Sequence, residues 1–437
     1  MKKLLPLFIS AAIGGLSTNV FADTLTEIYN QAKENDPTLL NAAAKRDAAF
    51  EAITSTRAVL LPQIQLTAGY DINQSNIDAR DSNKTTAGIG FTQELYNRAS
   101  WVNLDTAEKR ARSLDASYAA AQQDLILRVT SAYFGVLSAK DNLTFVQAEK
   151  AAVGRQLEQT KQRFEVGLSA ITDVHEAQAE YDTVLAEEVA AQNTLVNSYE
   201  DLREITGQDH SQLDTLDTAR FAASKSDTDL NTLVQQAEEE NLSLLSARIA
   251  KDIAKDEISQ ANSGHLPTLS LKGGYGFSKE SNDNNGNYAL KDAEDISVGI
   301  NLAIPVYSGG ATSSLTKQAE FNYVAASQDL EATYRSVVKN VRAFNNDISS
   351  SIGIIKAYNQ TVISAESAKE ATEAGFEVGT RTIVDVLDST RRLYDANKNL
   401  SSARYDYILN QLKLRQAVGT LNEQDVLDIN AGLKASK

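Results

Sequence analysis

The sequence Arg163-Phe-Glu-Val-Gly167 recurs 212 residues later as Gly375-Phe-Glu-Val-Gly379. The same residue types follow each copy at the same spacing: Ile171, Asp173 and Val174 after the first, and Ile383, Asp385 and Val386 after the second. A second correspondence, 205 residues apart, joins Leu61-Pro62 to Leu266-Pro267. An internal duplication indicates the architecture of a chain independently of any single motif. We therefore expect one structural unit used twice, over residues 23–220 and 221–437.

The first 22 residues have the pattern of a secretory signal peptide. Two lysines precede an apolar stretch from Leu4 to Leu16, and Ala22 is a small residue at the expected cleavage point. We expect residues 1–22 to be removed. The absence of cysteine fits an oxidising compartment and excludes a disulfide scaffold. No later segment approaches 18 consecutive apolar residues, so we expect no transmembrane helix in the mature protein.

The composition and the motifs argue against several classes of function. The formal net charge is −16, and loss of the two leader lysines makes it −18. Because phosphate contacts need a basic face, we expect no nucleic-acid binding. His175, His210 and His265 lack the carboxylate or cysteine spacing of a metal site, and the sequence has neither a phosphate-binding loop nor a nucleophile elbow. We therefore expect no enzymatic activity, no cofactor and no intrinsic metal.

The positions of the prolines indicate where helices are interrupted. After the leader, proline occurs only at Pro37, Pro62, Pro267 and Pro305. An interior proline costs a helix about 3 kcal/mol, so long proline-free tracts rich in Ala, Gln, Glu and Leu favour uninterrupted helices. The expected helices cover about residues 24–60, 98–166, 171–207, 228–263, 309–378 and 383–419. The two longest would each extend roughly 100 Å, with two shorter helices stacked end to end beside each.

Four shorter segments alternate apolar residues with small or polar ones, at about 62–72, 85–96, 267–278 and 295–306. This alternation over about ten residues is typical of strands in a transmembrane barrel, which face lipid on one side and water on the other. The polar loops 73–84 and 278–294 suit extracellular tips. A soluble sandwich is the competing interpretation, but two isolated hairpins between such long helices leave no second sheet for packing.

The number of strands then predicts an oligomer. About eight strands are needed to close a barrel, and open strand edges are not tolerated in lipid. Two copies would give eight strands and a filled interior, whereas three would give twelve strands and room for a lumen. Glycine and serine on the inward faces favour the water-filled pore of a homotrimer.

The duplicated helix–hairpin–helix–helix unit, the paired Phe-x-Val-Gly turns and the segment Val378-Gly-Thr-Arg-Thr-Ile-Val-Asp-Val-Leu-Asp388 resemble the outer-membrane efflux proteins. The resemblance runs from about Leu25 to Asn430. It implies a mainly α fold with a membrane β-barrel: a homotrimer with a 12-stranded barrel in the outer membrane of a Gram-negative cell and a long α-helical tunnel through the periplasm.

The resemblance also implies the function. The protein would be the exit duct of tripartite multidrug efflux and type I secretion systems, a passive channel gated at its periplasmic end. A periplasmic adaptor protein would connect it to an inner-membrane pump of the RND or ABC type. Ile171, Val174, Tyr181 and Leu185 have coiled-coil spacing, so a trimeric coiled-coil surface rod or adhesin without transport is the alternative.

Two turns are expected to carry the adaptor contacts. Gly167 and Gly379 follow the longest helices, where a left-handed cap favours glycine. By resemblance, the adaptor hairpins would dock on two sets of three residues: Val166, Gly167 and Leu168, and Val378, Gly379 and Thr380.

Asp385 and Asp388 lie three residues apart and share one helix face. An acid in the first helical turn is favourable by roughly 0.3–1 kcal/mol, which accounts for Asp173 but not for Asp388. By resemblance, Asp385 and Asp388 from three chains would form carboxylate rings at the periplasmic constriction. Such rings would attract cations and bind a multivalent cation that blocks the channel.

The resemblance finally implies a gate latch between the inner and outer helix pairs. Asp173, Gln156, Glu373 and Arg381 occupy the matching positions, and Arg381 with Asp173 would form an arginine–carboxylate pair. Phe376 departs from the family pattern, which has tyrosine there. One hydrogen bond to Asp173 would then be missing, so we expect the closed state to be weaker.

Overall fold

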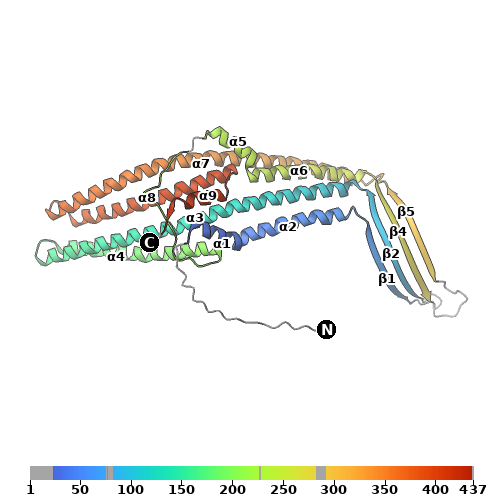
Figure 1. Cartoon of the computed structure of the whole chain (residues 1–437), viewed down its shortest axis with the longest axis horizontal. Coiled ribbons are helices and arrows are strands. Elements are labelled where there is room, and N and C mark those ends of the chain that lie inside the picture. The colour runs from blue at the N-terminus through green and yellow to red at the C-terminus, as the bar shows by residue number, and fades with distance from the viewer. Residues whose placement is uncertain (1–22, 75, 77–81, 226–227, 282–291, 436–437) are drawn as a thin grey trace.

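The computed structural model describes residues 23–74, 76, 82–225, 228–281 and 292–435. These residues form a long helical rod with a single larger sheet at one end (Figure 1). The expected signal peptide and the tips of both polar loops lie outside the described residues. Among the described helices, none carries an 18-residue stretch apolar enough to cross a bilayer.

The helices are α1 (Leu25–Asn35), α2 (Pro37–Ala58), α3 (Arg98–Glu165), α4 (Ile171–Thr206), α5 (Leu230–Glu240), α6 (Leu242–Asn262), α7 (Ala311–Glu377), α8 (Ile383–Val418) and α9 (Glu423–Asn430). The strands of the larger sheet are β1 (Gln63–Asn73), β2 (Ser82–Tyr96), β4 (Thr268–Ser281) and β5 (Ala293–Ala303). The strands β3 (Thr215–Leu216) and β6 (Leu433–Lys434) pair with each other near the ends of the two expected repeats.

Two of the expected helices were wrongly predicted as continuous. The segment 24–60 is broken at Asp36, whose side chain accepts a hydrogen bond from the Leu39 N–H at 2.8 Å and so caps α2. The segment 228–263 is broken at Asn241, which caps α6 through the Leu244 N–H at 3.0 Å. Both capping residues have extended backbone, so neither continues the preceding helix.

The predicted stacking of short helices beside long ones is confirmed. In Figure 1, α2 and α4 follow each other along α3, and α6 and α8 follow each other along α7. The long helices contain 68 and 67 residues, which corresponds to about 100 Å each. The largest apolar core lies where α1, α3, α8 and α9 meet, around Tyr133 and Phe134.

The larger sheet is antiparallel throughout, in the order β1-β2-β4-β5. Its register places the apolar residues of all four strands on one face, as in the row Leu66–Ile89–Tyr275–Ile296. The next row, Gln65–Gly90–Gly274–Ser297, lies on the opposite face and is small or polar. The period-two prediction is therefore confirmed for the middle of the sheet, and the charged residues Lys279 and Glu294 on the apolar side lie toward the end away from the helices.

The last strand is shorter than expected. We predicted it to continue to about residue 306, but β5 ends at Ala303. Pro305 has no N–H to donate to a strand partner and restricts Ile304 before it, which accounts for the early end. Among the described residues, β1 and β5 each have a strand partner on one side only, so both edges of the sheet are open.

Candidate functional site: the interhelical turns

The first turn joins α3 to α4 at the end of the rod farthest from the sheet (Figure 1). The Leu168 N–H donates to the Arg163 carbonyl at 2.8 Å, and the Gly167 N–H donates to the Phe164 carbonyl at 2.9 Å. These two bonds form a Schellman cap. Gly167 has φ +79°, as the left-handed cap requires, so its predicted structural role is confirmed.

The second turn, between α7 and α8, repeats the same cap. The Thr380 N–H donates to the Gly375 carbonyl at 2.8 Å, and the Gly379 N–H donates to the Phe376 carbonyl at 3.1 Å. Gly379 has φ +78°. A Cβ added at either Gly167 or Gly379 would meet no heavy atom within 4 Å, so conformation rather than crowding requires glycine there.

Three aliphatic side chains project from these turns into solvent. Val166, Leu168 and Val378 are 70 %, 69 % and 75 % exposed. Exposed apolar groups next to paired helix ends are suited to receive a partner's helices. Adaptor docking at these turns stays a prediction, because the structure describes one chain only.

Asp385 belongs to a capping box at the start of α8. Its carboxylate accepts hydrogen bonds from the Thr382 N–H at 2.9 Å and the Thr382 hydroxyl at 2.8 Å, while its own N–H donates back to that hydroxyl. The bond from the Thr382 N–H, and next the bond from the hydroxyl, hold the pKa of Asp385 below its usual value. Asp385 therefore caps its helix and is ionised at neutral pH.

Asp388 has two cationic partners on its own helix. Arg391 Nη2 lies 2.9 Å from one carboxylate oxygen, and Arg392 Nη2 lies 2.6 Å from the other. We did not predict these pairs, although the spacings of three and four residues are the ones that bring helical side chains together. Asp385, Asp388 and Arg392 line one groove between α7 and α8.

The predicted Asp173–Arg381 pair is not formed within one chain. Asp173 instead accepts hydrogen bonds from the Ser169 hydroxyl at 2.7 Å and from the Ala170 N–H at 3.2 Å. Arg381 folds back over the end of α7, where a Cβ added at Gly375 would lie 2.7 Å from its Cγ. Arg381 has no ion pair to any part of the chain that the structure describes.

The other two predicted latch residues, Gln156 and Glu373, make no contact between helix pairs that the described structure records as a hydrogen bond or ion pair. Glu373 pairs with Lys369 on its own helix at 3.1 Å. The side-chain nitrogen of Gln156 is buried without a hydrogen-bond partner among the described residues. The Asp173–Arg381 pair and the latch roles of Gln156 and Glu373 therefore stay predictions, which contacts between copies of the chain would have to satisfy.

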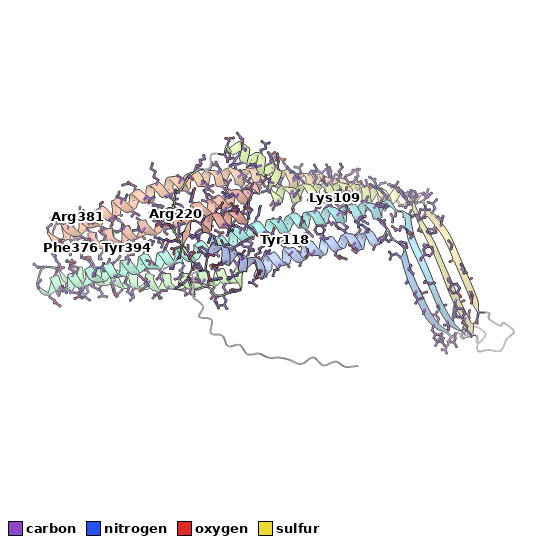
Figure 2. All side chains as sticks on the ribbon, viewed as in Figure 1. Lys109, Tyr118, Arg220, Phe376, Arg381 and Tyr394 are labelled. Atoms are coloured by element: carbon purple, nitrogen blue, oxygen red, sulfur yellow. The ribbon has the colours of Figure 1, made fainter. Side chains whose placement is uncertain are left out.

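Phe376 makes a link that sequence analysis missed. Its ring is 7 % exposed and packs with Ile383 and Val386 in an apolar cluster shared with α3 and α4. The guanidinium carbon of Arg163 lies 4.8 Å from the ring centroid, a cation–π contact between the last turns of α3 and α7. The sequence contained one signal for this contact, because the arginine at position 163 of the first repeat is replaced by Gly375 at the equivalent position of the second. Figure 2 shows Phe376 and Arg381 together at this end of the rod.

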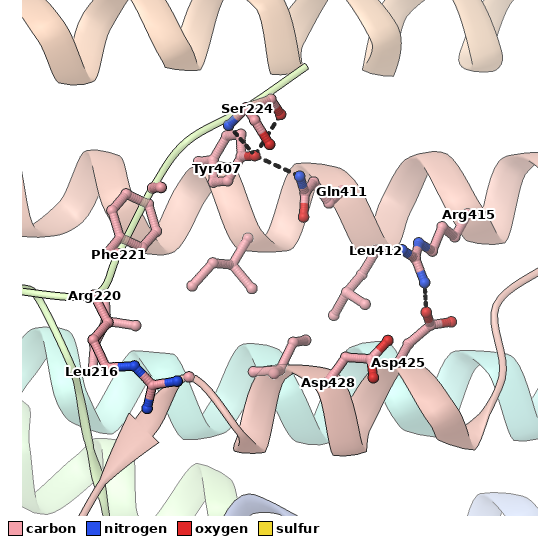
Figure 3. A pocket seen from close by; sticks show the side chains of 14 residues that line it. Leu216, Arg220, Phe221, Ser224, Tyr407, Gln411, Leu412, Arg415, Asp425 and Asp428 are labelled. Carbon is pink, nitrogen blue, oxygen red and sulfur yellow. Dashed lines mark hydrogen bonds and ion pairs between the residues drawn. The ribbon is translucent and has the colours of Figure 1, made fainter. Parts of the chain in front are cut away.

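A separate cavity of about 350 Å³ lies between α8, α9 and the segment that links the two halves (Figure 3). There the Tyr407 hydroxyl accepts from the Ser224 N–H at 2.9 Å and donates to the Ser224 carbonyl at 2.7 Å. Arg415 forms an ion pair with the buried Asp425. These groups are engaged by the fold itself: Tyr407 fastens the linking segment to α8, and the Arg415–Asp425 pair fastens α9 to α8.

A helical rod of about 100 Å thus carries an open-edged amphipathic sheet at one end and paired capped turns at the other, which is the single-chain arrangement that the resemblance predicted. The chain belongs to the outer membrane efflux protein family, whose model matches residues 28–208 and 233–420. The family predicted from the resemblance is thereby confirmed.

Three known proteins illustrate the relationship. The chain is 68 % identical over 437 residues to the outer membrane protein TolC of Vibrio cholerae, with 100 % of both chains covered. It is 30 % identical to the alkaline protease secretion protein AprF of Pseudomonas aeruginosa, over 98 % of this chain and 90 % of that one. The crystal structure of the outer membrane protein VceC from Vibrio cholerae shares its fold, with a TM-score of 0.75 at 18 % identity, over 90 % of this chain and 96 % of that one.

Proposed function

We propose that this protein is the outer-membrane exit duct of tripartite multidrug efflux and type I secretion systems. The observation that carries the proposal is the sheet, which has one apolar face, one small polar face and two open edges. Leu66 and Ile296 on the apolar face are 80 % and 83 % exposed in the single chain, so that face needs a lipid environment. The relatives named for the outer membrane and for protease secretion support this assignment.

Three copies would complete the wall. Twelve strands close both open edges and leave a lumen lined by the face that carries Gln65, Gly90, Gly274 and Ser297. The helical parts would then enclose a periplasmic tunnel whose narrow end lies at the interhelical turns. VceC has the same protomer fold, which supports this arrangement.

Aromatic residues mark the inner boundary of the membrane. Tyr96 ends β2, Trp101 lies in the first turn of α3, and Tyr307 lies between β5 and α7, and all three are exposed. Tyrosine and tryptophan are enriched at membrane–water interfaces because their rings combine apolar and polar character. The bilayer would therefore end where the strands give way to the helices.

The conduit itself would be passive, and its partners would supply selectivity and energy. A periplasmic adaptor would bind at the turns around Gly167 and Gly379 and connect the duct to an inner-membrane pump of the RND or ABC type. No residue is assigned a catalytic role. The alternative, a trimeric coiled-coil rod or adhesin, requires neither a lipid-facing sheet nor a lumen, so current across planar bilayers separates the two functions.

The direct test of the function is drug susceptibility in a strain that lacks the gene. We expect the deletion to sensitise cells to several chemically unrelated compounds and a plasmid copy to restore resistance. Secretion of a type I substrate in the same strains tests the second role. Unchanged susceptibility together with unchanged secretion would reject the proposed function.

The oligomeric state gives the first structural prediction. The full-length protein extracted in mild detergent is expected to sediment as a trimer, because four strands cannot close a barrel. A monomer or dimer would contradict the proposal.

Val298→Lys places a charge on the lipid-facing side, at a cost of about 2–4 kcal/mol near the bilayer centre, and should reduce recovery of the trimer from the outer membrane.

Ser297→Lys is the matched control for this change. Ser297 is the neighbour of Val298 in β5 but lies on the small polar face, so its lysine would point into the lumen. We expect normal recovery of the trimer from this variant. Equal loss in both variants would show that the sheet does not separate lipid from water.

The contact between Arg163 and Phe376 predicts an effect on gating. Arg163→Met keeps an apolar stem over the ring but removes the cation, which weakens the link between α3 and α7 by about 0.5–2 kcal/mol per chain. We expect a higher open probability in single-channel recordings. Arg163→Lys should restore part of the closed population. Equal open probabilities for the wild type, the Met variant and the Lys variant would show that this contact does not contribute to gating.

A further inference from the structure

Glu149 is a buried acid at a core position of α3. It lies three residues after Val146 and four before Val153, so all three share one helix face. Both valines belong to the apolar cluster between the helix pairs, and Glu149 itself is only 6 % exposed. Within the chain as described, its carboxylate has no hydrogen bond and no ion pair. An unpaired ionised carboxylate is costly at such a position, so the site favours the protonated form.

The groups around Glu149 on the neighbouring helices are mostly acidic. Glu187 and Glu180 approach from α4, and Asp395 approaches from α8. Burial, followed by the charges of Glu187, Asp395 and Glu180, raises the pKa of Glu149 to about 7, and the nearby Arg391 on α8 acts in the opposite direction.

The basic residues near Glu149 are engaged elsewhere. Arg391 pairs with Asp388 at 2.9 Å and lies 3.9 Å from Glu180. Lys150, the next residue on α3, pairs with Glu188 of α4 at 2.6 Å. Neither cation therefore neutralises Glu149 directly, so Glu149 becomes neutral by binding a proton.

We propose that Glu149 is a proton-binding residue that couples pH to the separation of α8 from the α3–α4 pair, and so to the opening of the tunnel. The protonation of Glu149 depends on the distance between the two helix pairs, because its acidic neighbours come from both of them. Glu180 and Glu187 belong to one pair and Asp395 to the other. The coupling to conduction rests on the proposed function, whereas the proton-dependent packing does not.

The direction of the effect follows from linkage. When α8 moves away and water reaches Glu149, its pKa falls from about 7 toward the ordinary value of 4.5. The packed arrangement therefore binds the proton more tightly, and acid favours it. This stabilisation is complete below pH 4.5 and is lost as the pH rises through about 7. Above that pH four carboxylates repel one another across the seam, and α8 separates more readily.

Single-channel recording over a range from about pH 5 to about pH 9 tests the proposal on the full-length protein. The wild-type open probability should rise with pH by up to about tenfold per pH unit for each chain, and level off above pH 7. Glu149→Gln, which is permanently neutral, should give a flat profile at the low, acid-like value. A wild-type profile in this variant would overturn the proposal.

Two further variants sharpen the test. Glu187→Gln removes the neighbour with the largest charge effect, so the midpoint of the profile should move to lower pH. Glu158→Gln changes an exposed glutamate of the same helix and should keep the wild-type profile. An unchanged midpoint in Glu187→Gln, or a flat profile in Glu158→Gln, would contradict the assignment to the buried cluster.

Hydrogen exchange gives a measurement that does not depend on conduction. Backbone amides of α3 and α8 around Glu149 should exchange faster above pH 7 than below it, after correction for the intrinsic pH dependence of exchange. The difference should vanish in Glu149→Gln. If the protein carries no current but shows this pattern, the proposed function fails and the proton-dependent packing stands. If corrected exchange is the same for wild type and variant, the packing proposal fails.

Discussion

Replacement of Gly167 or Gly379 by leucine is expected to abolish drug efflux while the trimer still assembles. Both glycines have φ near +80°, a conformation that costs residues with a Cβ about 1–2 kcal/mol. The space around each is open, so the chain can retain its turn and carry the new side chain outward. A bulky group there would cover the surface formed by Val166, Leu168 and Val378. Resistance should fall to the level of the deletion strain.

Matched variants separate docking from folding. Gly207 also has a positive φ, +70°, but it ends α4 at the opposite end of that helix from the turns. Gly207→Ala and Gly167→Ala should therefore cost similar stability, and neither adds bulk at the docking surface. Normal resistance in both leucine variants would refute the docking assignment. Equal losses in the two alanine variants would attribute the defect to folding.

The helical layout was largely predictable because its causes are local. Proline positions and helix-forming composition indicated each long helix, and the 212-residue repeat indicated that they come in two sets. The break before Pro37 was missed although a proline marks it, and the break at Asn241 was missed because no proline marks it. Asn241 lies 205 residues after Asp36, just as Leu266-Pro267 lies 205 residues after Leu61-Pro62. The duplication therefore indicated that a break at one of these two positions would be repeated at the other.

The contacts between helix pairs were not predictable in the same way. Arg163 was visible in the repeated motif, but its contact with Phe376 depends on how far α3 is rotated about its axis, which no local pattern specifies. Glu149 gave a weak signal as an acid within an apolar stripe. Its significance depends on Glu180, Glu187 and Asp395, which lie on two other helices and approach it only in the folded chain.

The predicted carboxylate rings of Asp385 and Asp388 stay a prediction, whereas the contacts of both residues within one chain are now described. The helix-capping role that sequence reasoning weighed as an alternative is present for Asp385, which bonds to Thr382. Asp388 pairs with Arg391 and Arg392, so its charge is partly balanced in the single chain. Capping and ring formation are compatible, because a capping carboxylate remains ionised and one of its oxygens is free to face a lumen.

The double change Asp385→Asn and Asp388→Asn is expected to abolish block by a multivalent cation. It removes two negative charges per chain, six from a trimer, and leaves Arg391 and Arg392 without the carboxylate that balances them. The constriction would change from net acidic toward net basic, so its preference for cations should also collapse. The affinity for a trivalent cobalt complex should fall at least about tenfold, which corresponds to only about 1.4 kcal/mol.

Thr382→Ala distinguishes the ring from the cap in this experiment. It removes the hydroxyl that bonds to Asp385, at a cost of about 1 kcal/mol to the start of α8, but keeps both carboxylates. If the carboxylates surround the pore, this variant should bind the cobalt complex like wild type in single-channel recordings in KCl, while the double variant does not. If they serve the helix alone, both variants should lose stability and neither should lose block. Undiminished block in the double variant would therefore place the constriction at other residues of the tunnel.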